Sequence, residues 1–195
     1  MVLREVCINW IDKDEVCISP GLVLSFQRFS WPAGGIMDYA PSSLGALPVG
    51  IGAKKELLLP LAYRECFWIG MQLSLGAPQI ALALAVELRD GLLLDTLSGK
   101  SWNSNQPSII VVGKTTRIEG IRRPDGRLCV FARETHSGAE LNSVCLRFHV
   151  AITYDTDIRE VSVRLVDYDT FTVETGKTAP DPLDPKAGYK GWLLP

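Results

Sequence analysis

The sequence predicts an all-β fold, specifically an antiparallel β-sandwich of jelly-roll or Greek-key type with long loops and little helix. The first reason is the uncharged stretch at residues 66–86, where apolar residues alternate with a period of two on both sides of a Gly-Ala-Pro turn. The second is a series of shorter alternating segments separated by turn-forming residues. The third is that no segment keeps a helical period for more than about two turns.

The uncharged stretch is 21 residues long, and roughly 20 apolar residues can span a bilayer as a helix. However, Gln72, Ser74 and Gln79 are polar, and Pro78 would interrupt a helix. We therefore expect a hairpin of two paired central strands and no membrane span. Its large apolar side chains share one face in each arm, at residues 67, 69, 71, 73 and 75 and at residues 80, 82, 84, 86 and 88. Small residues alternate with them in the second arm, so both faces of that strand should be covered.

Other alternating segments predict the remaining strands, with Arg123-Pro124-Asp125-Gly126 as a strong turn signal between two of them. A turn at residues 167–169 leads into residues 170–174, where no helix is expected. The predicted strands lie at residues 2–10, 16–18, 22–29, 92–94, 109–112, 117–121, 128–132, 146–154 and 161–165.

The length of 195 residues fits a single domain, residues 1–195. Two parts of it show no sustained period: an irregular loop at residues 30–55, rich in proline and glycine, and an extended tail at residues 176–195. Long loops inside compact domains are uncommon unless they have a role. Two interpretations stay open for the loop: a lid or binding loop, or an ordered arm that packs on a neighbouring molecule.

Composition and charge exclude several classes of protein. With 47% hydrophobic and 22% charged residues the chain is an ordinary globular protein rather than a disordered one. A net charge of −2 gives no general basic field to attract nucleic acid or anionic lipid. A local basic run contrasts with a mostly acidic segment at residues 155–184, and we interpret the two as solvated or mutually paired faces. The run comprises Lys114, Arg117, Arg122, Arg123, Arg127 and Arg133.

The five cysteines are an odd number without metal-binding spacing, so neither a zinc site nor another metal or cofactor is predicted. The chain also begins directly with an alternating segment, and we expect a reducing, cytoplasmic environment with buried thiols. Paired aspartates at positions 155 and 157 and at 167 and 169 could bind a hard cation. The favoured interpretation is that they accept backbone hydrogen bonds in turns.

Candidate binding residues are aromatic and basic side chains expected in loops, turns or termini. Exposed tryptophan can stack on a sugar or peptide, whereas Trp68 in a central strand is expected to belong to the core. The segment Ser98-Gly99-Lys100-Ser101 is similar to the end of a phosphate-binding loop, but Leu94 stands where the leading glycine is needed. The candidates are Trp31, Tyr39, Trp102, Arg122, Arg123 and Trp192.

Three segments and the end of the chain carry a resemblance: YRECFWI at residues 63–69, LSGKSW at 97–102, residues 107–121, and YKGW at 189–192. Together they resemble an uncharacterised family of microbial proteins with Tyr-x-x-Glu-Ala-x-Trp-Ile and Leu-Thr-Gly-x-x-Trp segments. The resemblance covers roughly residues 40–130 and the last few. This sequence departs from the pattern at Cys66 and Ser98, and it lacks a Trp-Leu-Asp-Gly-Ile form at residues 117–121. The resemblance implies a shared architecture and no catalytic residue.

Two hypotheses of function follow. The first is a non-enzymatic protein that acts by binding or self-association, with the loop at residues 30–52 and the tail as contact surfaces. The second is a hydrolase or carbohydrate-acting enzyme with a polar cleft near Glu134 and His136, the most enzyme-like pair in the sequence. The first is favoured, because an exposed loop histidine rarely has a catalytic role.

Overall fold

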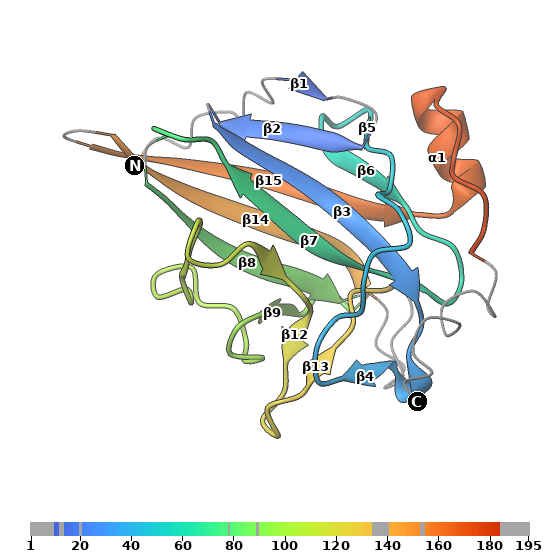
Figure 1. Cartoon of the computed structure of the whole chain (residues 1–195), viewed down its shortest axis with the longest axis horizontal. Helices are drawn as coiled ribbons and strands as arrows, with labels where there is room; N and C mark the ends of the chain where they lie inside the picture. The colour runs from blue at the N-terminus through green and yellow to red at the C-terminus, as the bar shows by residue number, and fades with distance from the viewer. Residues whose placement is uncertain are drawn as a thin grey trace.

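The computed structural model describes residues 10–11, 14–19, 21–77, 79–88, 90–133, 141–152 and 155–183. Its strands form three sheets (Figure 1). Every strand pair in the first sheet is antiparallel. In order across the sheet, its strands are β1 (Trp10–Ile11), β2 (Glu15–Ser19), β3 (Leu22–Ser30), β7 (Glu65–Leu73) and β11 (Arg117–Ile118).

The second sheet is the largest, and all its pairs are antiparallel except β15 with β6. Its order is β10 (Ile110–Val111), β8 (Ile80–Leu88), β14 (Leu141–Ile152), β15 (Asp155–Val166), β6 (Leu57–Pro60) and β5 (Gly50–Ile51). A further strand, β9 (Leu93–Asp95), pairs with β8. The third sheet consists of β12 (Ile121–Arg122), β13 (Leu128–Cys129) and β4 (Ile36–Met37).

The all-β class with little helix is confirmed, because the described residues hold a single α-helix, α1 (Tyr168–Thr175), and one 3-10 turn, Ala33–Gly35. The jelly-roll or Greek-key sandwich stays a prediction. The helix itself replaces the non-helical segment expected at residues 170–174. It begins there because the Asp167 side chain accepts a hydrogen bond from Thr170 N, and it ends at Gly176 in the left-handed conformation.

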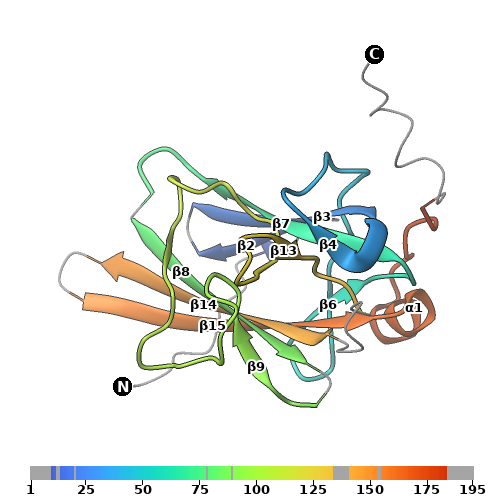
Figure 2. The same ribbon diagram turned by 90° about the horizontal axis from the view of Figure 1, so that it is seen from below.

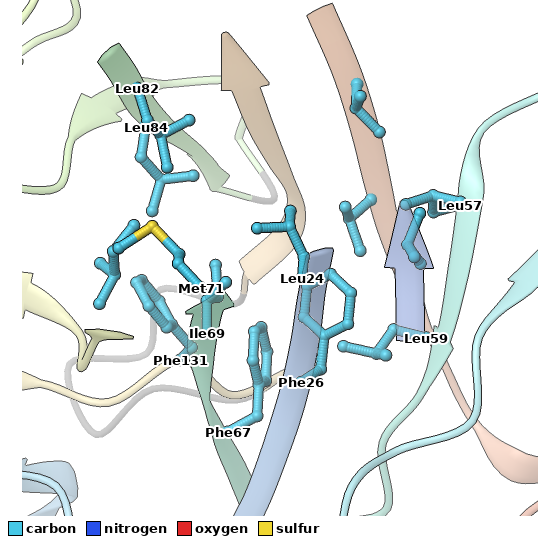
Figure 3. Close-up of a cluster of buried hydrophobic side chains, with 14 of the residues drawn as sticks. Leu24, Phe26, Leu57, Leu59, Phe67, Ile69, Met71, Leu82, Leu84 and Phe131 are labelled. Atoms are coloured by element: carbon cyan, nitrogen blue, oxygen red, sulfur yellow. The ribbon is translucent and has the colours of Figure 1, made fainter. Parts of the chain in front are cut away.

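The main hydrophobic core lies between the first and second sheets, which Figure 2 shows on opposite sides of the molecule. Figure 3 shows Met71 of the first sheet next to Leu84 of the second, and Phe26 of the first sheet beside Leu59 of the second. The Phe67 ring packs against both Phe26 and Phe131, with centroids 5.9 and 5.4 Å apart. Alternation in both sheets therefore buries one set of large side chains in a shared core.

The predicted central hairpin is wrong in its pairing. Both arms are strands, β7 and β8, but β7 pairs with β3 and β11, whereas β8 pairs with β14, β9 and β10. The turn between them carries the chain from the first sheet to the second. The alternating pattern specifies which face of a strand is apolar, and two facing sheets satisfy it as well as one hairpin does.

The prediction that both faces of the second arm are covered is confirmed, whereas Leu75, expected on the apolar face of the first arm, is fully exposed. Ala83 and Ala85 are buried, so both faces of β8 are covered. No helix within the described residues is long and apolar enough to cross a membrane.

Some of the smaller predictions are confirmed and others are wrong. The turn at residues 123–126 joins β12 to β13 as predicted. The strand expected at residues 117–121 is instead two short strands, β11 and β12, that belong to different sheets. Strands β4, β5 and β6 were not predicted. Cys17 and Cys66 are buried and in no disulfide. The strand expected at residues 2–10 lies outside the described residues except for Trp10.

Candidate functional site

A hollow of about 410 Å³ lies beside the segment that contains β10, β11 and β12. These three short strands belong to the second, first and third sheets, in that order. We call this cavity the basic hollow. Volumes of this size are typical of small-molecule sites. Its lining comes from all three sheets and from the loop after β9: Thr96, Leu97, Ile109, Ile110, Val111, Lys114, Thr115, Arg117, Ile118, Glu119, Gly120, Arg122 and Leu128.

The charges around the basic hollow do not cancel. Arg117 pairs with Glu119, with Arg117 Nε 2.5 Å from Glu119 Oε1. No carboxylate in the described part of the chain lies within ion-pair distance of Lys114 or Arg122, and both side chains are exposed. The Arg122 guanidinium makes a long hydrogen bond of 3.4 Å to Gly126 O. The rim therefore presents two cationic groups that have no carboxylate partner among the described residues, beside the ion pair of Arg117 with Glu119.

The floor of the basic hollow is apolar and well supported. Ile118 and Leu128 are buried, and Leu97 is partly buried against the main core. Gly120 allows β12 to approach β13 closely, because a Cβ atom there would lie 2.3 Å from Cys129 O. The hollow thus combines cationic groups at its rim with an apolar surface below them, an arrangement that suits an anion with an apolar body.

The wall formed by the loop after β9 is held against β12. Arg122 N donates to Thr96 O over 2.7 Å, and Thr96 N and Oγ1 both donate to Leu84 O. Gly99 has a positive φ of 66°, and a Cβ atom there would lie 2.1 Å from Arg122 O. These contacts fix the backbone that carries the Arg122 side chain.

The buried carboxylate of Asp95 organises this loop. Its Oδ1 accepts hydrogen bonds from Leu97 N, Ser98 N and Ser98 Oγ, and its Oδ2 accepts one from Ser108 N over 2.8 Å. Burial alone would raise the pKa of Asp95, but the hydrogen bonds from Ser108 and Ser98 outweigh it and hold this pKa below its ordinary value. The ionised form is thus the one that the fold stabilises.

We expect Asp95→Asn to lower the free energy of unfolding at pH 7 by about 2 kcal/mol, because an amide cannot accept all of these hydrogen bonds. A depressed folded-state pKa contributes stability that is present above the unfolded pKa of about 3.9 and is lost as the pH falls through the folded value. The difference between the two chains should therefore shrink in urea titrations below about pH 4. Asp90→Asn is the control, since Asp90 is exposed and accepts one hydrogen bond from Leu92 N; a penalty for Asp95→Asn that is unchanged in acid would contradict this role.

The basic hollow is connected to the loop at residues 38–41. Glu119 Oε2 accepts a hydrogen bond from Ala40 N, and Trp68 Nε1 donates to Pro41 O over 3.2 Å. The Arg117 guanidinium lies over the Trp68 ring, 5.8 Å from its centroid. Part of the predicted irregular loop is therefore attached to the same residues that line the hollow.

The structure separates the residues that the sequence proposed for binding. Of the five that the structure describes, only Arg122 lines the basic hollow. Arg123 pairs with Asp125 in the neighbouring turn. Tyr39 is 59% exposed beside the residues that contact Glu119 and Trp68. Trp31 packs in a second apolar cluster with Trp68.

The other proposed residues lie elsewhere. Trp102 is half-buried in the loop after β9, where its backbone N donates to Leu93 O. Trp192, and Glu134 with His136 of the alternative enzyme, lie outside the described residues. Trp68, expected in the core, is partly buried against the second apolar cluster, on the face of β7 opposite the main core. The alternation of β7 already placed it opposite Phe67, but its size and apolar neighbours favoured the core.

The basic run divides into separate roles. Arg123 and Arg127 pair with Asp125, Arg133 lies 3.7 Å from Asp167, and only Lys114, Arg117 and Arg122 reach the hollow. The expected pairing with the acidic segment at residues 155–184 is confirmed for Arg133 alone among the described residues, because Arg123 and Arg127 pair with Asp125 in their own turn. Within the described ranges, no group of three or more histidine, cysteine or acidic residues could hold a metal ion. No protein-family model, curated protein or solved structure matches this chain.

Proposed function

We propose that the protein acts by binding a small organic anion in the basic hollow, without chemistry of its own. The anionic group, such as a carboxylate, sulfonate or phosphate ester, contacts Lys114 and Arg122. The apolar body of the ligand lies on Leu97, Ile118 and Leu128. The observation that supports this most is a pair of cationic side chains, with no carboxylate partner in the described ranges, above a buried apolar floor.

The composition of the lining favours binding over catalysis. Its single described carboxylate, Glu119, already pairs with Arg117 and accepts from Ala40 N, so it is engaged in holding the structure. Its hydroxyls come from Thr96, which donates to Leu84 O, and from the exposed Thr115. An activated nucleophile needs an adjacent base, and the described lining provides no histidine for that role.

The expected affinity is modest. A charge-assisted hydrogen bond contributes about 1.5–3 kcal/mol, and the exposure of Lys114 and Arg122 places each contact at the lower end of that range. Burial of part of an aromatic or aliphatic body on Ile118 and Leu128 adds about 25 cal/mol per Å². Binding should weaken as salt is added, because exposed charges are screened.

The direct test is calorimetric titration with 1-naphthalenesulfonate, an anion with an apolar body. We expect it to bind, and we expect the neutral 1-naphthalenesulfonamide to bind more weakly. Arg122→Gln should reduce the affinity for the sulfonate about tenfold, equivalent to about 1.4 kcal/mol, because it removes one cation while keeping a side chain of similar length. The stability of the variant should be unchanged, since the Arg122 side chain is exposed.

Arg127→Gln is the matched control. Arg127 is equally close to the β12–β13 turn in sequence but pairs with Asp125 and does not line the hollow. Equal binding of the sulfonate and the sulfonamide, or equal losses in the two variants, would show that the probe does not recognise the cations of the basic hollow.

A further inference from the structure

A buried ionic cluster joins the first sheet, the helix and the tail at the end of the molecule where β3 finishes. Its centre is Glu65, the first residue of β7, which is 3% exposed. Glu65 Oε2 accepts hydrogen bonds from Tyr168 Oη over 2.6 Å and from Ala62 N over 3.0 Å. Arg28 Nη1 lies 3.5 Å from Glu65 Oε1 and donates to Tyr168 Oη. We call Arg28, Glu65 and Tyr168 the tail clamp.

The tail clamp holds the tail through two backbone groups. Arg28 Nη1 donates to Asp181 O over 2.8 Å, and Glu65 Oε1 accepts from Leu183 N over 3.0 Å. These two groups flank Pro182, which has no N–H of its own to satisfy. Arg28 and Glu65 therefore bind the backbone on both sides of a proline, one as donor and one as acceptor. The edge of a sheet binds an added peptide strand through backbone groups in a similar way.

The protonation states of the tail clamp agree with this arrangement. Burial raises the pKa of the Tyr168 hydroxyl, and the neighbouring Glu65 carboxylate raises it further. Tyr168 is therefore a neutral donor to Glu65, which leaves Oε1 of the carboxylate for the tail. Arg28 Nε is buried and has no hydrogen-bond partner among the described residues. The clamp thus presents charged groups to the tail rather than an apolar groove.

Within residues 176–183, the part of the tail that the structure describes, the remaining attachment is slight. Ala179 packs against Leu58, Val166 and Phe171, and Lys177 Nζ donates to Val49 O. The segment leaves α1 through Gly176, which has a φ of 67°. Figures 1 and 2 show it running along the outside of the molecule from α1. A short peripheral segment that follows such a turn can separate from its own molecule without loss of the main core.

We propose that the tail clamp is a docking site for the tail of a second copy of this chain as well as for its own, so that two copies associate by exchanging tails. The recognised groups are backbone groups of an extended segment, and a second copy presents the same ones. A tail in the same molecule competes at an effective concentration in the millimolar range. Exchange in the unaltered chain therefore becomes appreciable only at high protein concentration, as in other exchanged dimers.

The first experiment removes the competition from the tail of the same molecule. Leu183→Pro deletes the N–H that Glu65 accepts and leaves the clamp intact, whereas Leu183→Ala keeps the N–H and is the control. A fluorescent peptide with the sequence of residues 176–185 is titrated into each full-length chain and followed by anisotropy. We expect the peptide to bind the Leu183→Pro chain at least about tenfold more tightly than the Leu183→Ala chain, whose own tail competes. A peptide with proline in place of Leu183 should not bind.

Tail exchange between whole chains is tested by mixing two complementary variants. Leu183→Pro has a working clamp and a disabled tail, and Arg28→Met has a working tail and a disabled clamp. Each should sediment as a monomer alone, and the mixture should form a one-to-one dimer. No peptide binding to a folded Leu183→Pro chain would overturn the docking site, and peptide binding without dimer in the mixture of folded variants would overturn tail exchange. If Arg28→Met does not fold, Arg28→Lys replaces it, because lysine cannot reach Tyr168, Asp181 and Glu65 together.

Discussion

Replacing Leu84 by aspartate is expected to leave the chain unfolded at 25 °C. Leu84 is 2% exposed in β8 and belongs to the core that both large sheets share (Figure 3). Loss of the leucine side chain alone costs about 2–5 kcal/mol, and an unpaired buried carboxylate adds several kcal/mol more. Since domains of this kind are stable by about 5–15 kcal/mol, the sum removes most or all of the stability.

Circular dichroism and urea titration measure this effect, with Leu75→Asp as the matched control. Leu75 undergoes the same chemical change at a position that is fully exposed after the end of β7. We expect the control to change the free energy of unfolding by no more than about 0.5 kcal/mol. A folded Leu84→Asp chain with stability within about 2 kcal/mol of the unaltered chain would contradict the shared core.

Glu65→Ala is expected to cost about 3–5 kcal/mol, because it leaves the charge of Arg28 buried without its partner. It also removes the acceptor for Tyr168 Oη, Ala62 N and Leu183 N. Tyr168→Phe, which removes a single donor, should cost only about 1 kcal/mol. Urea titration of the three chains at pH 7 measures the difference.

Adding Arg28→Met to Glu65→Ala should cost less than the sum of the two single changes, because the unpaired cation is then removed. Asp38→Ala is the control, since Asp38 is an exposed carboxylate in the loop before Tyr39. If Glu65→Ala and Asp38→Ala change the stability equally, the tail clamp is not a stabilising element and the description of Glu65 as its centre fails.

Much of the fold was predictable because alternation reports directly on burial. The apolar faces of β7, β8 and β15 are buried as the pattern indicates. Strand pairing was not predictable in the same way. Two arms with matching apolar faces fit one hairpin or two facing sheets, and the choice depends on distant strands such as β3 and β14 that the local pattern does not contain.

The short helix α1 shows a second limit of the sequence pattern. Only Phe171 of α1 is buried, so the helix has no apolar stripe that would identify it. Its signal is the Asp167 cap together with Gly176 at the end, and these residues also occur in ordinary turns. Strand β6 was missed for a related reason, since all four of its residues are buried and alternation is absent.

The candidate site was predictable only in part. Arg122 was a candidate binding residue, whereas Lys114 and Arg117 belonged to a basic run interpreted as solvated or paired. Which members of that run pair with a carboxylate depends on the turn at Asp125 and on Glu119. The floor of the hollow comes from the first sheet, the third sheet and the loop after β9, and no single segment carries its signature. The tail clamp is even harder to predict from the sequence, because Arg28 and Tyr168 are 140 residues apart in it.

The most direct test of the basic hollow is its footprint in a ¹H–¹⁵N NMR titration with 1-naphthalenesulfonate. We expect the largest chemical-shift changes at the backbone amides of residues 96–97, 109–122 and 128, with saturation at millimolar probe and loss of the changes at high salt. Changes that concentrate around Trp31 and Tyr39, or that are absent from residues 114–122 at the same probe concentration, would contradict the proposal that this hollow binds organic anions.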